Sequence, residues 1–276
     1  MKKIVLSAFL FFPVFLYAQF WEIGVFTGAS NYNGDFSESA IKMNETHFAY
    51  GGIIRYNINR YLTLKGNIIK GMISGSDENA KKYYHRQWSR NLSFRSTVLD
   101  IGIQPEFNIL GYRTNHFTYK SSPYIFAGVS LLRFNPQALY NEKWTNLQPL
   151  GTEGQYLNVP EYFDRRYKLT QIVIPFGFGW KYSIGKNINI GCELSARKTF
   201  TDYLDDVSTN YVDLKDLLYR NGLIAVKLSN RTGEIGDELI EKSEDDPRGS
   251  PDAKDWYYFA GFTFTYSLLP RGCLGY

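Results

Sequence analysis

Apolar and polar residues alternate along most of the chain beyond its first twenty positions, and this period of two is the main structural signal. In the segment 255–268, the even positions are aromatic or aliphatic, whereas the odd positions include Thr263, Thr265 and Ser267. Successive side chains of a β-strand point to opposite faces, so this segment has one apolar face and one mixed face. Eight segments show the pattern, each near or above the about 9 to 11 residues with which a tilted strand crosses a bilayer. They are 20–30, 48–58, 61–73, 92–109, 124–134, 170–184, 188–200 and 255–268.

The connections between these segments vary in length in a regular way. Those after the first, third, fifth and seventh segments are long and polar, whereas those after the second and sixth are the short turns 59–60 and 185–187. The connection after the fourth, 110–122, is intermediate. Long external loops alternating with short periplasmic turns are typical of an even-stranded outer-membrane barrel with both termini in the periplasm. We therefore predict an all-β fold: a transmembrane antiparallel up-and-down β-barrel of about eight strands, with long extracellular loops and a filled lumen, in contact with outer-membrane lipids.

Two other architectures remain open at this point. A secreted soluble β-sandwich also has alternating strands, although it has no reason to sort its loops by parity. A barrel of ten strands would take two strands from 210–229. Because Leu214, Leu217 and Leu218 follow a helical spacing, we favour a short helix or an ordered loop there.

The first residues have the pattern of a signal peptide. Met1, Lys2 and Lys3 form a basic start, and the apolar run 4–16 that follows is shorter than the about 20 residues of a membrane helix. Because the small residue Ala18 precedes a plausible cleavage point, we expect a signal peptide over 1–18 and a barrel domain over 19–276. No cysteine stands directly after the expected cut, which argues against a lipoprotein.

Composition supports a barrel and excludes one class of partner. Aromatic residues reach 17%, with 22 Tyr, 20 Phe and 5 Trp beside 24 Gly, and alternating aromatic strands with glycine are typical of membrane barrels. Removing Lys2 and Lys3 from the 31 basic residues leaves 29, against 27 acidic ones. With this balance and without a run of Lys and Arg, we expect no nucleic-acid partner.

The more polar face of each predicted strand is assigned to the lumen, where it places four acidic and four basic side chains. An eight-stranded barrel is only wide enough to be filled by its own side chains. Opposite charges in equal number would therefore pair with each other, whereas a selective pore would need charges of one sign. We expect a filled lumen, and its predicted charge network consists of Glu22, Arg55, Lys65, Asp100, Glu106, Lys181, Glu193 and Arg197.

Candidate catalytic and metal-binding groups are few. His47, His85 and His116 lie in loops or at strand ends, and no Ser, His and carboxylate fall together on one predicted rim. We expect no enzymatic activity, no cofactor and no small-molecule substrate.

An acidic cluster follows the seventh predicted strand. Its members, Asp202, Asp205 and Asp206, do not have the spacing of a calcium-binding loop. We expect these carboxylates to pair with Arg197 or Lys198, or to be solvated, rather than to hold a metal.

Several loop segments have sequences that membrane periodicity does not require. They are 90–96 (RNLSFRS), 147–155 (LQPLGTEGQ), 198–209 (KTFTDYLDDVST) and 228–231 (LSNR), together with the last strand. With these segments the chain resembles the PorG-like outer-membrane proteins of the type IX secretion system, from Trp21 to Tyr266. The resemblance implies a non-enzymatic barrel that anchors a periplasmic ring, built from the lipoprotein PorK and its partner PorN, in a machine that exports proteins and is linked to gliding motility. An independent small channel or a surface adhesin is the alternative function, and from the residues alone these segments are ordered loops that pack on one another above the barrel.

The two cysteines are not expected to pair with each other. Alternation places Cys192 on the lipid face, whereas Cys273 lies beyond the last strand in the oxidising periplasm, and a disulfide needs Cα atoms within roughly 7 Å. Either Cys273 stays reduced or it forms an intermolecular disulfide. The resemblance implies the ring lipoprotein as the partner in the second case.

Overall fold

The computed structural model describes residues 20–37, 42–79, 90–234, 242–244 and 246–268. The predicted signal peptide, His85 and Cys273 lie outside these residues. The strands are β1 (Phe20–Asn33), β2 (His47–Asn57), β3 (Leu62–Ser76), β4 (Ser93–Asn108), β5 (Ser121–Ala127), β6 (Val129–Arg133), β7 (Pro136–Tyr140), β8 (Lys143–Asn146), β9 (Thr170–Ile184), β10 (Ile188–Lys198) and β11 (Trp256–Leu268). The helices are α2 (Leu214–Asn221) and α3 (Leu223–Ser229), with the short 3₁₀ segments η1 (Met43–Glu45), η2 (Asp77–Asn79), η3 (Gln148–Leu150), η4 (Pro160–Arg165) and η5 (Thr232–Glu234).

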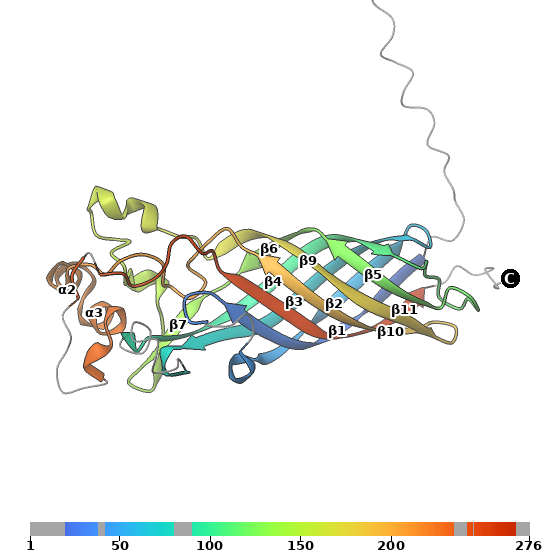
Figure 1. Cartoon of the computed structure of the whole chain (residues 1–276), viewed down its shortest axis with the longest axis horizontal. Helices are drawn as coiled ribbons and strands as arrows, with labels where there is room; N and C mark the ends of the chain where they lie inside the picture. The colour runs from blue at the N-terminus through green and yellow to red at the C-terminus, as the bar shows by residue number, and fades with distance from the viewer. Residues whose placement is uncertain (1–19, 38–41, 80–89, 235–241, 245, 269–276) are drawn as a thin grey trace, which may run out of the picture.

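One antiparallel sheet closes on itself to form a barrel (Figure 1). Its strands follow the order β3-β2-β1-β11-β10-β9-β5-β4, and the pairing of β3 with β4 closes the ring. β5 and β6 share one position, since both pair with β4 and β9. They are separated at Gly128, where a Cβ would lie 2.2 Å from the carbonyl oxygen of Ile103, so that only glycine permits this close approach of the backbones. The barrel therefore has eight strand positions, as predicted.

The two faces of the barrel wall differ sharply. In β9, Ile172 and Phe178 are 60% and 59% exposed on the outside, whereas the alternate residues Val173 and Lys181 are buried inside. The same alternation runs through β1, β4, β10 and β11. An outer surface of this size covered with aliphatic and aromatic side chains is stable in lipid rather than in water. The fold is that of a transmembrane β-barrel of the outer-membrane type.

The two ends of the barrel are built differently. One end carries the beginning of β1, the end of β11, the two short turns and the loop 109–120 (Figure 1). At the opposite end the wall continues beyond the apolar band, because β7 extends β6 along β4, with Gln137 opposite Arg95, and turns back as β8. The long connections gather there into a folded layer over the barrel, which we call the loop cap: residues 90–92, 134–169, 199–234 and 246–255.

The segment 210–229 contributes helices to the loop cap, so a ten-stranded barrel is wrong. Asp213 begins α2 by accepting hydrogen bonds from the backbone N–H groups of Lys215 and Asp216. Leu217 and Ala225 bury the inner sides of α2 and α3. No helix in the described parts of the chain is long and apolar enough to cross a membrane.

Candidate functional site

The lumen contains a six-member ionic network centred on Glu106 of β4. Its carboxylate accepts from Arg55 Nε at 3.1 Å and Lys181 Nζ at 2.7 Å, and Lys65 Nζ lies 3.5 Å away. All four side chains are buried, and they come from four strand positions, since β2, β3, β4 and β9 each contribute one. The network therefore links strands across the barrel as well as neighbours.

Two further carboxylates complete this network. Glu193 of β10 accepts from Lys65 Nζ at 2.7 Å and from the hydroxyl of Tyr124 at 2.9 Å. Glu22 of β1 lies 4.0 Å from Arg55 and accepts from Asn57 and Thr265. Three carboxylates thus face three cations, with neutral donors completing the remaining hydrogen bonds.

The other two predicted lumen charges form a separate pair nearer the loop cap. Arg197 Nε lies 3.4 Å from Asp100, whose carboxylate also accepts from Tyr257 at 2.8 Å and Asn67 at 2.9 Å. Asp100 and Glu106 are about 20 Å apart along β4 at the usual rise of a strand. The structure places all eight predicted residues inside the barrel, but in two groups of six and two.

The loop 109–120 fills the lumen at the short-turn end. Tyr112 is buried there beneath Lys181, whose Nζ lies 5.2 Å from the centre of the ring. Thr114 hydrogen-bonds Ser267 at 2.8 Å and Asn189 at 3.1 Å. The interior is therefore occupied by side chains at the level of this loop, at Glu106 and at Asp100.

The loop cap brings together the loop segments that carried the sequence resemblance. Glu153 lies at their centre, fully buried, and accepts from the backbone N–H groups of Ser208 and Thr209 at 2.9 and 3.1 Å. Arg248 donates to the same carboxylate at 2.9 Å and to the carbonyl oxygen of Ser229. These loops pack on one another above the barrel, as the sequence indicated.

Arg90, which lies just before β4, connects the end of β3 to the rest of the loop cap. Its guanidinium makes a two-pronged contact with Asp77, at 2.8 and 2.7 Å, and donates to the carbonyl oxygen of Arg248 at 2.6 Å. The guanidinium also lies 4.6 Å from the ring centre of Phe36. This planar, two-pronged geometry requires arginine rather than lysine.

The expectation for the acidic cluster Asp202, Asp205 and Asp206 is wrong. All three carboxylates are buried, and they are paired neither with Arg197, which turns into the lumen, nor with Lys198, which is exposed. Hydroxyl groups donate to all three instead: Asp202 Oδ2 accepts from Ser208 at 2.7 Å, Asp205 from Tyr32, and Asp206 from Thr152 and from Tyr167 at 2.6 Å. The other carboxylate oxygen of Asp202 is buried without a hydrogen-bond partner among the described residues. Nowhere in the described ranges do three acidic, His or Cys side chains have an arrangement suited to a metal ion.

Tyr32 joins Asp205 to a second buried carboxyl, that of Asp255, at 3.0 Å. Asp205 also accepts from the N–H of Val207, and Asp255 from that of Leu204. A tyrosine hydroxyl has one proton and donates once, so one of its two carboxyl partners must donate to it. Burial raises the pKa of both carboxyls well above the ordinary value, and acidic neighbours raise each further. The extra proton is therefore shared within this pair: one of the two carboxyls, Asp205 or Asp255, donates to Tyr32, which in turn donates to the other.

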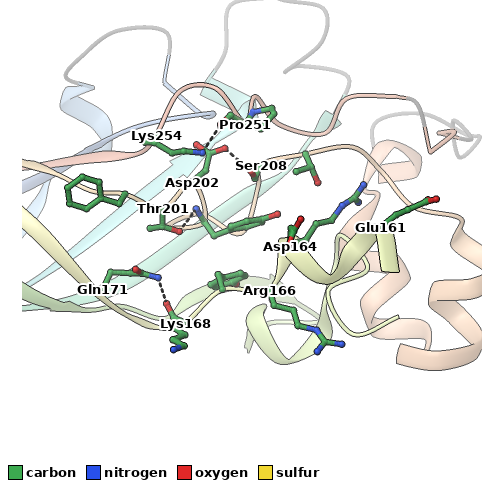
Figure 2. A pocket seen from close by; sticks show the side chains of 15 residues that line it. Glu161, Asp164, Arg166, Lys168, Gln171, Thr201, Asp202, Ser208, Pro251 and Lys254 are labelled. Atoms are coloured by element: carbon green, nitrogen blue, oxygen red, sulfur yellow. Dashed lines mark hydrogen bonds between the residues drawn. The ribbon is translucent and has the colours of Figure 1, made fainter. Parts of the chain in front are cut away.

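A pocket of about 590 Å³ opens beside this cluster (Figure 2). The stacked rings of Tyr167 and Tyr203, with centroids 4.7 Å apart, line it together with hydroxyl and charged side chains. Burial raises the pKa of Asp202, on its wall, to about 7. The charged residues that line the pocket are Glu161, Asp164, Arg165, Arg166, Lys168, Asp202 and Lys254.

Sequence reasoning missed the central residues of the cap. Glu153, Tyr167 and Arg248 lie in segments without periodicity, so no pattern separates a buried polar residue there from a solvated one. Tyr32, which reaches the cap from the end of β1, lies beyond the predicted strand 20–30. Two features of the sequence do point to Glu153: it stands between two glycines, Gly151 and Gly154, and it belongs to a segment that carries the resemblance. In the structure both glycines have positive φ, as in a tight turn.

The family model described as "Domain of unknown function (DUF6089)" matches residues 2–224. Comparison with curated proteins finds no match. Among solved structures, Ail of Yersinia pestis in complex with sucrose octasulfate, a heparin analogue, is similar at 8% identity, with coverage of 91% of this chain and 99% of that chain and a TM-score of 0.43. Neisserial surface protein A is similar at 9% identity, with coverage of 89% of this chain and 96% of that chain and a TM-score of 0.43. OprG of Pseudomonas aeruginosa is similar at 10% identity, with coverage of 90% of this chain and 94% of that chain and a TM-score of 0.34.

Proposed function

The chain belongs to the DUF6089 family, whose description assigns no activity, and we propose that it is a non-enzymatic outer-membrane anchor for a periplasmic protein-secretion assembly. The observation that carries the proposal is the filled interior. A barrel closed by ionic groups and by an inserted loop provides a rigid fixture in the membrane rather than a passage through it. The sequence resemblance to PorG-like proteins supports the more specific role, in which the barrel holds the PorK and PorN ring of a type IX secretion machine linked to gliding motility.

The charge of the short-turn end supports a docking role there. In the turns 58–61 and 185–187 and the loop 109–120, the charged residues are Arg60, Arg113, Lys120 and Lys186, with no Asp or Glu. Phe117 at the tip of the loop is 93% exposed. With both termini periplasmic, as the loop parity predicts, this basic and aromatic end would face an acidic, partly apolar surface of the ring.

The folded loop cap favours one other candidate, a surface adhesin. Loops that serve only to connect strands do not need a shared buried centre such as Glu153 with Arg248. The two functions place the partner at opposite ends of the barrel, and this difference is the basis of the test.

The test is co-purification from membranes that contain the ring proteins, with tagged variants altered at one end only. Phe117→Ser with Lys186→Glu changes the short-turn end, and Tyr219→Ser with Arg220→Glu changes equally exposed residues of α2. We expect the first pair to reduce recovery of PorK and PorN at least tenfold and the second to leave it unchanged. Equal recovery with both variants, or no recovery with the unaltered protein, would contradict the anchor.

Planar-bilayer recording tests the filled interior separately. The purified barrel should give no steady conductance, because the side chains at Glu106 and Tyr112 occupy the lumen. Sustained open-channel currents would contradict this and support the channel alternative.

A further inference from the structure

The outer wall of the barrel has an apolar groove over β10. The groove has a volume of about 290 Å³ and is lined by Trp180, Tyr182, Ile190, Gly191, Cys192, Phe262 and Phe264. In the register, Cys192 lies between Trp180 of β9 and Phe262 of β11, and Ile190 likewise lies between an aromatic residue of each neighbouring strand. Because Cys192 is small and its neighbours are large, it forms the floor of a groove with two aromatic walls.

Contacts with the segment around the start of β5 hold the wall formed by β9. The ring nitrogen of Trp180 donates to the hydroxyl of Ser121 at 2.8 Å. The ammonium group of Lys120 lies 5.7 Å from the centre of the Tyr182 ring. A wall that is already ordered loses little side-chain freedom when the groove is filled, and this favours binding.

The groove lies in the half of the membrane nearest the short-turn end. Trp180 and Tyr182 stand four and two residues before the end of β9 at Ile184. At about 3.3 Å per residue, Trp180 is about 13 Å from that end along a tilted strand, and its depth in the membrane is smaller still. The apolar band of such a barrel is about 25 Å tall. The groove therefore faces the hydrocarbon of the leaflet on this side.

An acyl chain fits this groove better than a protein does. Seven residues line the groove, whereas a stable protein interface takes about 20 to 30 residues from each partner. The outside of a barrel is convex, so a second copy would reach the floor with a single side chain at most. The two aromatic walls are two strand spacings apart, or about 9.5 Å, which leaves room for a chain to lie along β10. Such a chain gives the lining the dispersion contacts that an empty hollow lacks.

The end of the groove toward the short turns lies beside a basic group. Lys120 is exposed there, and no carboxylate oxygen in the described ranges lies within 4.0 Å of its ammonium group. Its carbonyl oxygen accepts from the N–H of Ser183 at 2.8 Å, which fixes it at the end of β9. An apolar groove that ends beside a cation matches a ligand with an apolar chain and an anionic head.

We propose that this groove retains one acyl chain of an anionic phospholipid from the leaflet on the short-turn side, with the phosphate beside Lys120. The chain lies over Cys192, between the aromatic walls. The inference depends on the barrel spanning a membrane but not on a secretion role, so each can fail without the other.

Native mass spectrometry of the purified barrel tests the proposal with two probes, phosphatidylglycerol and the diacylglycerol with the same chains. Cys192→Trp fills the floor of the groove and should reduce retention of phosphatidylglycerol about tenfold, because the chain loses its dispersion contacts. Ile68→Trp adds the same ring to the lipid face of β3, four strand positions away, and is the matched control that should leave retention unchanged. Lys120→Gln should weaken retention of phosphatidylglycerol but not of diacylglycerol.

Photolabelling of the unaltered protein gives an answer even if a variant does not fold. In vesicles that contain phosphatidylglycerol with a photoreactive group in one chain, we expect label to concentrate on the segments 180–182, 190–192 and 262–264. Labelling spread evenly over the lipid-facing strands would overturn the proposal, as would equal retention of phosphatidylglycerol by Cys192→Trp and Ile68→Trp. Retention of diacylglycerol as strong as that of phosphatidylglycerol would also contradict it. A dimer in the mass spectrum, with these three segments unlabelled, would assign the groove to a second copy instead.

Discussion

The lumen and the loop cap both bury carboxylates, but they neutralise them in different ways. In the lumen, Glu22, Glu106 and Glu193 face three cations, and Asp100 faces a fourth. In the cap, most carboxyls accept from hydroxyl and backbone N–H groups, and one of them holds a proton. Burying an ion costs free energy that an opposite charge or several hydrogen bonds must offset. The lumen is thus held by charge balance, whereas the cap combines one buried ion pair, Glu153 with Arg248, with carboxyls whose hydrogen bonds depend on protonation.

The largest expected effect is the loss of a central lumen charge. Glu106→Ala would leave Arg55 and Lys181 without their nearest carboxylate, and we expect a loss of about 3 to 5 kcal/mol in the free energy of unfolding. Unfolding in urea, followed by heat-modifiable gel migration, measures it. Glu161→Ala, at an exposed position of the cap, is the control and should change stability by less than about 0.5 kcal/mol. A loss at Glu106 no larger than this would show that the lumen is not held by charge balance.

The next largest effect is expected for charges placed on the lipid face of the barrel wall. Arginine at Phe178 or Phe262, both exposed on the lipid face, should cost about 2 to 4 kcal/mol near the middle of the bilayer. Thr263→Arg, next to Phe262 but buried inside, should act through crowding and added charge in the lumen. The same unfolding assay compares them with Asp252→Arg in the cap. If Phe262→Arg were as well tolerated as Asp252→Arg, the assignment of the two faces would be wrong.

A smaller effect, confined to the cap, is its dependence on pH. Burial raises the folded-state pKa values of Asp202, Asp206 and Asp255 above those of the unfolded chain, to about 7 for Asp202 and about 6 for Asp206. Such groups bind protons more tightly when folded, so their stabilisation is complete below about pH 4 and is lost as the pH rises through the folded pKa values. Each contributes a slope of up to about 1.4 kcal/mol per pH unit in that window. Protease sensitivity of the cap should therefore increase from about pH 5 to pH 8.

Asp255→Asn sharpens this prediction. Its amide nitrogen can donate permanently to Tyr32 while its oxygen accepts from the N–H of Leu204, as the protonated carboxyl does. Because this variant cannot titrate at position 255, we expect the rate of proteolysis to change less steeply between pH 5 and pH 8. A variant with the unaltered pH profile would show that Asp255 is not the protonated partner.

The smallest effect on stability is expected for the cysteines. Cys192 is exposed on the outer face, beside Trp180 and Phe262, where a thiol behaves as a small apolar group, and Cys192→Ser should cost less than about 1 kcal/mol. Cys273→Ser should not change stability. If Cys273 forms an intermolecular disulfide, a heavier band on gels without reductant should disappear with Cys273→Ser and persist with Cys192→Ser. A monomer band in every lane would exclude the cross-link.

The barrel was predictable because period-two alternation and loop parity are properties of neighbouring positions in sequence. These two patterns predicted the eight strand positions, and they predicted that Glu22, Lys65 and Arg197 point into the lumen. They did not determine which charges meet, because the contact between Lys65 and Glu193 depends on the register around the whole ring. For this reason the sequence predicted a single lumen network, whereas the structure has one group of six charges and a separate pair.

The cap was predictable only as a set of ordered loops. Asp202, Asp205 and Asp206 looked like a solvated cluster because the hydroxyls that satisfy them come from Tyr32, Thr152, Tyr167 and Ser208, in distant segments. Arg248 likewise stands in a segment rich in charged residues, yet it is buried against Glu153. Buried polar contacts between loops leave no periodic trace in the sequence.

The pairing of β1 with β11 also limits the order in which the molecule is made. The first and last strands run side by side from Trp21 opposite Leu268 to Asn33 opposite Trp256. A chain exported from its N-terminus therefore cannot close until its final segment has arrived, and until then Glu22 lacks its hydrogen bond from Thr265. Contacts between residues this far apart in sequence form slowly. The unfinished chain must be kept from aggregating while two sheet edges remain open, so cells that produce this protein should depend on periplasmic chaperones, and a copy truncated before β11 should be degraded rather than inserted.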